Sequence, residues 1–168
     1  MKEKLASAER EVILRPVGNN PKRLNRCPKC GAGLLARNMR HSCGRYSLAA
    51  LFARSTPSVR QMFSKFARMV RACGRVELIP QKTRAVFLRH VRFVAVYPRK
   101  GWMEIGIELP ERCPHARFHK IESYTKRMHG HYLRIDQLGQ LDRQVQRWLR
   151  DAYRAALRKD STALRRRS

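Results

Sequence analysis

Acidic side chains are scarce in this sequence. Its 168 residues contain 12 aspartates and glutamates against 38 lysines and arginines, which gives a formal net charge of +26 with neutral histidines. Charge of one sign repels itself in a compact fold, and a polyanionic partner relieves that repulsion. Nucleic acid is the commonest polyanion in cells, so it is the first partner that the composition predicts.

Long hydrophobic runs are absent as well. No stretch approaches the roughly 20 apolar residues that cross a bilayer, and no basic amphipathic segment stands apart from the core-forming ones, so we expect no membrane partner. Residues 1–15 lack the apolar region of a signal peptide, which favours a cytoplasmic protein. Hydrophobic residues still make up 43% of the chain, enough for one folded domain with a small module attached.

Groups that perform catalysis are few. The sequence has four aspartates, and it lacks a glycine-rich phosphate loop, a nucleophile elbow and a zincin motif. Glu104 and Glu108 form the best local carboxylate pair, and we interpret them as partners of neighbouring Arg and Lys side chains. His129 and His131 have no carboxylate or cysteine nearby to complete a metal site. We therefore predict a protein that binds and does not catalyse.

Cysteine and histidine cluster in one short segment. Cys-Pro-Lys-Cys-Gly at 27–31 is followed ten residues later by His-Ser-Cys at 41–43. Two thiolates at this spacing can reach one ion, and four protein ligands complete a tetrahedral zinc site with no open position for water. The segment has few hydrophobic residues, so the metal would supply its fold. We predict one structural Zn²⁺ bound by Cys27, Cys30, His41 and Cys43.

Hydrophobic periodicity organises the rest of the chain. Thr56 and Pro57 start a helix whose apolar residues recur at helical spacing until Gly74, and residues 141–157 form a second helix. Between them, short β-branched and aromatic runs predict strands at 76–79, 85–88, 93–97, 102–109, 117–123 and 131–135. This order predicts an α+β fold, with a mainly antiparallel sheet packed with two main helices. The predicted parts are an N-terminal extension and linker (1–25), the zinc-binding Cys3His module (26–47), the α+β domain (48–158) and a basic disordered tail (159–168).

Basic residues occur beside aromatic ones near the strand ends. Tyr97, Trp102, Tyr124 and Tyr132 are the aromatic residues concerned. Such pairs suit stacking on unpaired bases together with contact to phosphates, and DNA and structured RNA both fit. Arginines also follow the outer side of the last helix at steps of three and four residues. The predicted nucleic-acid contacts are Lys29, Arg37 and Arg40 in the zinc module, Lys82, Arg84, Arg99 and Lys100 around the strand turns, and Arg143, Arg147, Arg150 and Arg154 in the last helix.

Two other functions fit the same sequence. A cleft between the sheet and the helices would make the domain a binding site for a protein partner or a small anion. An enzyme acting on a nucleotide-like anionic substrate would use Lys82, Arg99, His129 and His131. Binding that collapses with salt favours nucleic acid, whereas saturable binding of a small anion at ~0.5 M salt favours either alternative.

Five motifs together resemble a known family. They are CPKCG at 27–31, HSC at 41–43, VELIPQKTR at 76–84, RFVAVYPRK at 92–100 and the Leu-Asp…WLRDAY run at 141–153. In combination they resemble the bacterial domain of unknown function 5655 over residues 26–155. The resemblance implies an α+β domain, preceded in some members by a zinc-ribbon-like Cys/His segment. It carries over no activity, although related domains beside restriction-type modules point toward nucleic acid by analogy.

Overall fold

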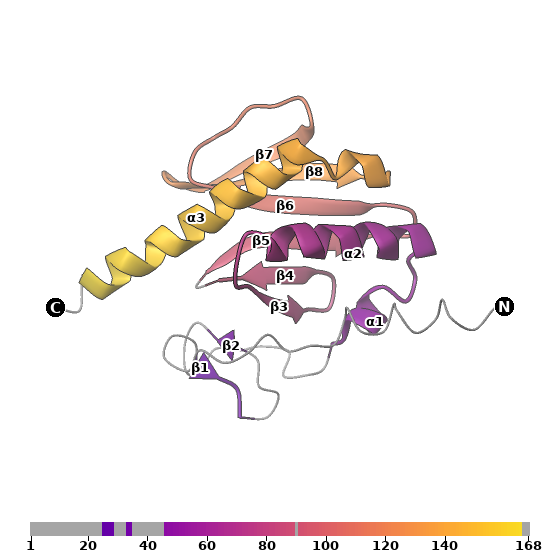
Figure 1. The fold of residues 1–168 in the computed structure, drawn as a ribbon, viewed down its shortest axis with the longest axis horizontal. Coiled ribbons are helices and arrows are strands. Elements are labelled where there is room, and N and C mark those ends of the chain that lie inside the picture. Colours follow the sequence, from indigo (N-terminus) through magenta and orange to yellow (C-terminus); the bar gives the residue numbers. More distant parts are fainter. Residues whose placement is uncertain (1–24, 29–32, 35–45, 90, 166–168) are drawn as a thin grey trace.

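A six-stranded antiparallel sheet with helices on one face forms the body of the molecule (Figure 1). The computed structural model describes residues 25–28, 33–34, 46–89 and 91–165. The strands of the sheet are β3 (Glu77–Pro80), β4 (Ala85–Leu88), β5 (Arg92–Pro98), β6 (Met103–Leu109), β7 (Phe118–Thr125) and β8 (Met128–Ile135). The helices are α1 (Leu48–Leu51), α2 (Pro57–Arg71), the 3-10 helix η1 (Leu138–Gln140) and α3 (Arg143–Arg165). The predicted α+β class, antiparallel sheet and two main helices are confirmed.

The strand order is β3-β4-β5-β6-β8-β7. Because β6 pairs with β8, strand β7 is an edge strand. All the strand pairs are antiparallel, so the turns lie at the two ends of the sheet. The β3–β4 turn (81–84) and the β5–β6 turn (99–102) lie at one end, which we call the Trp102 end. The β4–β5 turn (89–91) and the β7–β8 turn (126–127) lie at the other, which we call the Arg127 end.

Helix α2 begins and ends where its sequence predicts. Pro57 occupies the first turn, and Thr56 precedes it in an extended conformation. The Thr56 side chain makes no capping bond; instead its backbone N–H donates to the carbonyl of Lys100 at 2.9 Å, which ties the start of α2 to the Trp102 end. After the helix, Gly74 has a φ of 138°, a conformation that L side chains rarely adopt.

Helix α3 is longer than predicted. The side chain of Asp142 accepts hydrogen bonds from the backbone N–H groups of Gln144 and Val145, at 3.0 and 3.1 Å, and so caps the helix start. The helix continues past the predicted end at Leu157 to Arg165, so most of the predicted disordered tail (159–168) is helical. No glycine or proline interrupts the residues after 157, and the Ala, Leu, Lys and Arg among them favour helix.

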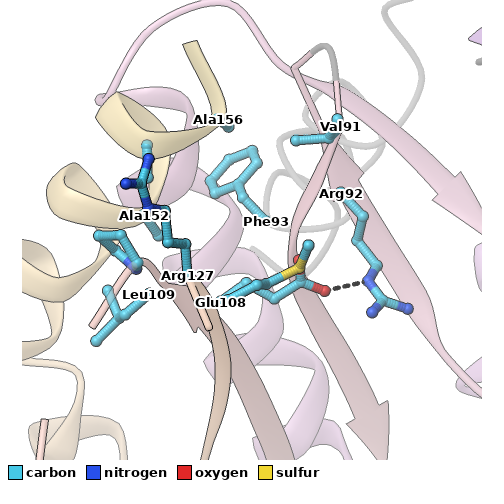
Figure 2. A pocket seen from close by; sticks show the side chains of 11 residues that line it. Val91, Arg92, Phe93, Glu108, Leu109, Arg127, Ala152 and Ala156 are labelled. Atoms are coloured by element: carbon cyan, nitrogen blue, oxygen red, sulfur yellow. Dashed lines mark hydrogen bonds and ion pairs between the residues drawn. The ribbon is translucent and has the colours of Figure 1, made fainter. Parts of the chain in front are cut away.

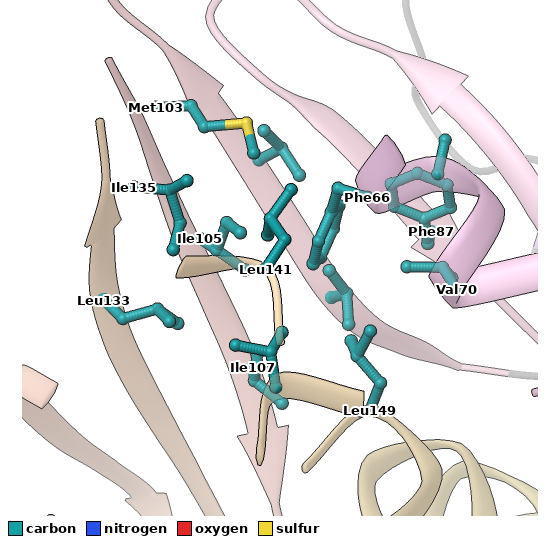
Figure 3. Packing of buried hydrophobic residues seen from close by; sticks show 14 of the residues in the cluster. Phe66, Val70, Phe87, Met103, Ile105, Ile107, Leu133, Ile135, Leu141 and Leu149 are labelled. Atoms are coloured by element: carbon teal, nitrogen blue, oxygen red, sulfur yellow. The ribbon is translucent and has the colours of Figure 1, made fainter. Parts of the chain in front are cut away.

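The core lies between the sheet and the two main helices (Figure 3). Side chains of β6 and β8 meet side chains of the helices there, and Phe66 of α2 packs edge-on against Phe87 at 6.0 Å between ring centroids. The labelled members are Phe66, Val70, Phe87, Met103, Ile105, Ile107, Leu133, Ile135, Leu141 and Leu149. A second, smaller cluster of Val86, Leu88 and Ala95 forms on the opposite face of the sheet.

Two very short strands precede the main sheet. β1 (Asn25–Arg26) pairs antiparallel with β2 (Gly33–Leu34), so the connection between them contains the CPKCG motif. Within the described residues, none of the helices has the length and apolarity needed to cross a membrane.

Candidate nucleic-acid interface

The sheet face opposite α2 and α3 gathers aromatic and charged side chains from β5 to β8. Alternation along β6 sends Met103, Ile105 and Ile107 into the core and Glu104 and Glu108 to this other face. We call it the aromatic face. Its members are Tyr97, Trp102, Glu104, Glu108, Lys120, Glu122, Tyr124, Tyr132 and Arg134.

Two glycines allow tyrosine rings to lie against the sheet. Gly106 pairs with Tyr132 across β6 and β8, and a Cβ on Gly106 would stand 3.0 Å from that ring. Gly130 lies under Tyr124, whose hydroxyl would be 2.6 Å from an added Cβ. The structure therefore uses these glycines for close ring packing. Strand β8 begins at Met128, three residues before the predicted start at 131, and Gly130 is a strand residue.

The tyrosine hydroxyls converge on one carboxylate. Tyr124 and Tyr132 each donate to Oε2 of Glu122, at 3.1 and 3.0 Å, and their hydroxyls are within hydrogen-bond distance of each other. Lys120 Nζ lies 2.5 Å from Glu122 Oε1. The hydrogen bond from Lys120, followed by that from Tyr132, lowers the pKa of Glu122. Burial, followed by the bond with Tyr124, raises the pKa of Tyr132, so this hydroxyl stays protonated.

Cations lie over the rings of this face. Among the described residues five cation–aromatic contacts occur, and four of them are on the aromatic face or at its Trp102 end. Trp102 receives two guanidinium groups, that of Arg134 at 4.6 Å and that of Arg99 at 5.7 Å from the ring centroid. The others are Lys120 over Tyr132 at 5.4 Å and Arg84 over Tyr97 at 5.8 Å. The arrangement presents alternating rings and positive charges.

The turn that carries Arg99 and Lys100 is held by hydrogen bonds from the residues that precede α2. Its carbonyl groups accept hydrogen bonds from the Ser55 hydroxyl and the Thr56 N–H, both at 2.9 Å. The side chains of Arg99 and Lys100 are exposed. Lys82 is exposed in the neighbouring turn, and Arg84 donates to Gln81 at 2.6 Å and to the Tyr97 hydroxyl at 3.0 Å. The four predicted contacts of the strand turns are therefore brought together at the Trp102 end.

The predicted contacts on α3 form a second, separate surface. Arg143, Arg147, Arg150 and Arg154 are all exposed on the outer side of the helix, and they span about 16 Å along its axis. Asp151 lies 3.7 Å from Arg154, and Asp142, which precedes Arg143, is paired with Arg117 at 2.9 Å. Helix α3 covers the face of the sheet opposite the aromatic face, so its arginines are separated from that face by the sheet.

The two glutamates of β6 are each paired with a basic side chain. Glu108 Oε1 lies 2.5 Å from Nε of Arg92, which confirms the interpretation made for this residue. Glu104 is paired instead with His119, at 3.2 Å. In the described part of the chain no three His, Cys, Asp or Glu side chains gather as a metal site would require.

His131 is a structural residue. It is fully buried; its Nε2 accepts from the N–H of Cys113 at 2.9 Å, and its Nδ1 bonds the carbonyl of His129 at 3.1 Å. These bonds fit the neutral ring, and burial lowers its pKa. Lys82 and Arg99 lie at the Trp102 end, about 20 Å of strand away from His129. The fold does not bring together the four groups of the enzyme alternative.

The predicted zinc module falls mostly outside the described residues. Cys27 is described and is buried, with 6% of its surface exposed. The other proposed ligands, Cys30, His41 and Cys43, and the proposed contacts Lys29, Arg37 and Arg40, lie outside the described residues.

Sequence reasoning missed Arg134 and Lys120 as members of the interface. Arg134 lies in β8, which pairs non-consecutively with β6 in the register Glu104–Arg134, and Lys120 lies in the edge strand β7, opposite Tyr132 of β8. Alternation within 128–135 puts Arg134 and Tyr132 on the same face, but it does not say which strand lies alongside.

A family model described as domain of unknown function (DUF5655) matches residues 49–156. The matched region contains the whole six-stranded sheet and excludes the Cys/His segment. No curated protein and no solved structure matches the chain.

Proposed function

The chain belongs to the DUF5655 family, and we propose that this member is a non-catalytic, zinc-stabilised protein that binds nucleic acid through its aromatic face. The observation that carries the proposal is the Trp102 ring with the guanidinium groups of Arg99 and Arg134 against it. Guanidinium planes and aromatic rings both stack on unpaired bases, and the same cations contact phosphates.

Unpaired nucleotides suit this face better than a duplex. The tyrosine rings of this face lie close to the sheet surface, as Tyr132 does over Gly106. They therefore offer flat surfaces on which bases can stack. Duplex recognition uses an element that enters a groove. The arginines of α3 would then serve as a second phosphate contact on the far side, for a strand long enough to wrap around the domain.

The zinc module is the second part of the proposal. Cys27 is buried at the end of β1, and the antiparallel pairing of β1 with β2 supports a hairpin around the CPKCG motif. Zn²⁺ held by Cys27, Cys30, His41 and Cys43 would stabilise this small segment, which has little core of its own. Lys29, Arg37 and Arg40 would add positive charge beside it.

The proposal is tested with labelled single-stranded DNA, single-stranded RNA, duplex DNA and structured RNA. Fluorescence anisotropy across a salt series gives the affinity and its salt slope for each. We expect the single strands to bind more tightly than the duplex, with log affinity falling by about 0.7 per phosphate contacted for each tenfold rise in salt. Comparison of the two single strands decides between RNA and DNA. Equal affinity for all four nucleic acids and for heparin would contradict the proposal, because it would show only a generic attraction of polyanions to the positive net charge.

A further inference from the structure

A pocket of about 270 Å³ opens at the Arg127 end of the sheet (Figure 2). The pairing between β5 and β6 ends at Val94–Ile107, and the pocket lies beyond this point, between residues 91–93 and 108–110. Helix α3 passes over it and contributes small side chains, Ala152, Ala155 and Ala156. The end of strand pairing and the short alanine side chains together leave the space.

The walls of the pocket are mainly apolar. Phe93, Leu109 and Met128 line it together with the alanines of α3. Its polar groups are the ion pair of Arg92 with Glu108, at 2.5 Å, and the side chain of Arg127. Arg127 is exposed, and within the described residues its guanidinium has no hydrogen bond or ion pair.

We propose that this pocket binds a small amphipathic monocarboxylate, with its aliphatic or aromatic body against Phe93 and Met128 and its carboxylate on Arg127. The two arginines and Glu108 leave one net positive charge at the pocket, which matches one negative charge on the ligand. The carboxylate of Glu108 disfavours a dianion such as a phosphate monoester. A mostly apolar lining with a few polar groups is typical of ligand pockets, and the volume fits a small ligand.

The pocket shares Glu108 with the aromatic face, whereas Arg127, Phe93 and Met128 are not members of that face. The pocket lies at the Arg127 end, about 20 Å along β6 from Trp102. One site can therefore be lost without the other, and the failure of one proposal leaves the other intact.

The test uses octanoate as the probe, titrated calorimetrically into the full chain at ~0.15 M NaCl, where charges farther apart than about 8 Å are largely screened and direct contacts are screened less. Acetate has the same charge without the apolar body, and octan-1-ol has the body without the charge. We expect saturable 1:1 binding of octanoate and at least about tenfold weaker binding of either comparator, since each lacks one half of the recognition. Equal binding of octanoate and octan-1-ol would overturn the assignment of the carboxylate.

A matched pair of variants locates the site. Arg127→Gln removes the unpaired guanidinium and should weaken octanoate binding about tenfold. Lys126→Gln removes the same charge from the adjacent exposed residue, which does not line the pocket, and should change the affinity less than about twofold. Equal effects of the two variants would contradict the proposal.

The apolar half of the site is tested by filling it. Ala155→Leu places a larger side chain at the half-buried wall of the pocket and should abolish octanoate binding while the circular dichroism spectrum is retained. Unchanged affinity in a folded Ala155→Leu protein would overturn the location. If this variant does not fold, the comparison of Arg127→Gln with Lys126→Gln decides whether octanoate binds in the pocket.

Discussion

The guanidinium of Arg134 lies 4.6 Å from the ring centroid of Trp102, although 31 intervening residues separate the two along the chain. Their contact follows from the register of β6 with β8, in which Glu104 pairs with Arg134 and Met103 with Ile135. Strand β7 is displaced to the edge of the sheet, so β8 can occupy the place beside β6. The central feature of the proposed interface thus depends on a non-consecutive strand pairing.

Replacing Trp102 with leucine should weaken binding of single-stranded nucleic acid without changing its salt slope. Loss of base stacking on an aromatic ring costs about 1–3 kcal/mol, and the substitution removes no charge. Anisotropy titrations across a salt series measure both quantities. A Trp102→Leu protein with unchanged affinity would exclude this ring from the interface.

Removing the two exposed cations of the β5–β6 turn should lower the salt slope. The double variant Arg99→Ala/Lys100→Ala is expected to bind single strands more weakly and to reduce the slope by about 1.4, since each lost phosphate contact contributes about 0.7. Arg147→Ala/Arg150→Ala removes the same charge from α3, on the other side of the sheet. A larger effect of the α3 variant would move the interface to the helical side.

Metal analysis should find close to one zinc per purified chain. Cys30→Ser is expected to lose the metal, because zinc of this type needs all four ligands. Cys73→Ser is the control and should retain it, since Cys73 lies where Gln146 of α3 donates to its sulfur at 3.3 Å. Unchanged zinc in Cys30→Ser would disprove the assigned ligand set.

Acidification should destabilise the fold in part through His131. Burial lowers the pKa of this residue in the folded protein below the ordinary value of 6.5. Between these two values the unfolded chain binds a proton that the folded chain excludes, so the free energy of unfolding falls as the pH drops below 6.5. Well above pH 6.5 this residue contributes no pH dependence to the free energy of unfolding. Urea unfolding from pH 7.5 to 5 should give a shallower decline for His131→Gln, and parallel curves would contradict this role.

Gly74 and Gly101 should respond differently to alanine. At Gly74 the φ of 138° is unfavourable for alanine, and the new Cβ would stand 2.4 Å from the Tyr153 hydroxyl. We expect Gly74→Ala to lower the free energy of unfolding by about 2 kcal/mol. A Cβ on Gly101 would have no atom within 4 Å, so Gly101→Ala should stay within about 0.5 kcal/mol. Similar free energies of unfolding for the two variants would contradict the expected backbone strain of alanine at position 74.

Local patterns were enough to predict the elements of the main domain. Pro57 and Gly74 mark the limits of α2 because proline suits a first helical turn and glycine accepts a positive φ. Alternation in β6 identified the half-buried strand with Glu104 and Glu108 on one face. The predicted start of the last strand, at residue 131, was three residues late, because Gly130 lies within β8 and its lack of a Cβ leaves room for the Tyr124 ring.

By itself the sequence determined the excess of positive charge, the limits of α2, most strand positions and the proposed Cys3His ligand set, because each depends on residues close together in the chain. Only the tertiary structure decided which strands lie side by side. That choice put Arg134 on Trp102, separated the α3 arginines from the Arg99 turn, buried His131 as a neutral ring and opened the pocket under Ala155. Strand order depends on how the whole core packs, and residue alternation specifies a face of the sheet without specifying a neighbour.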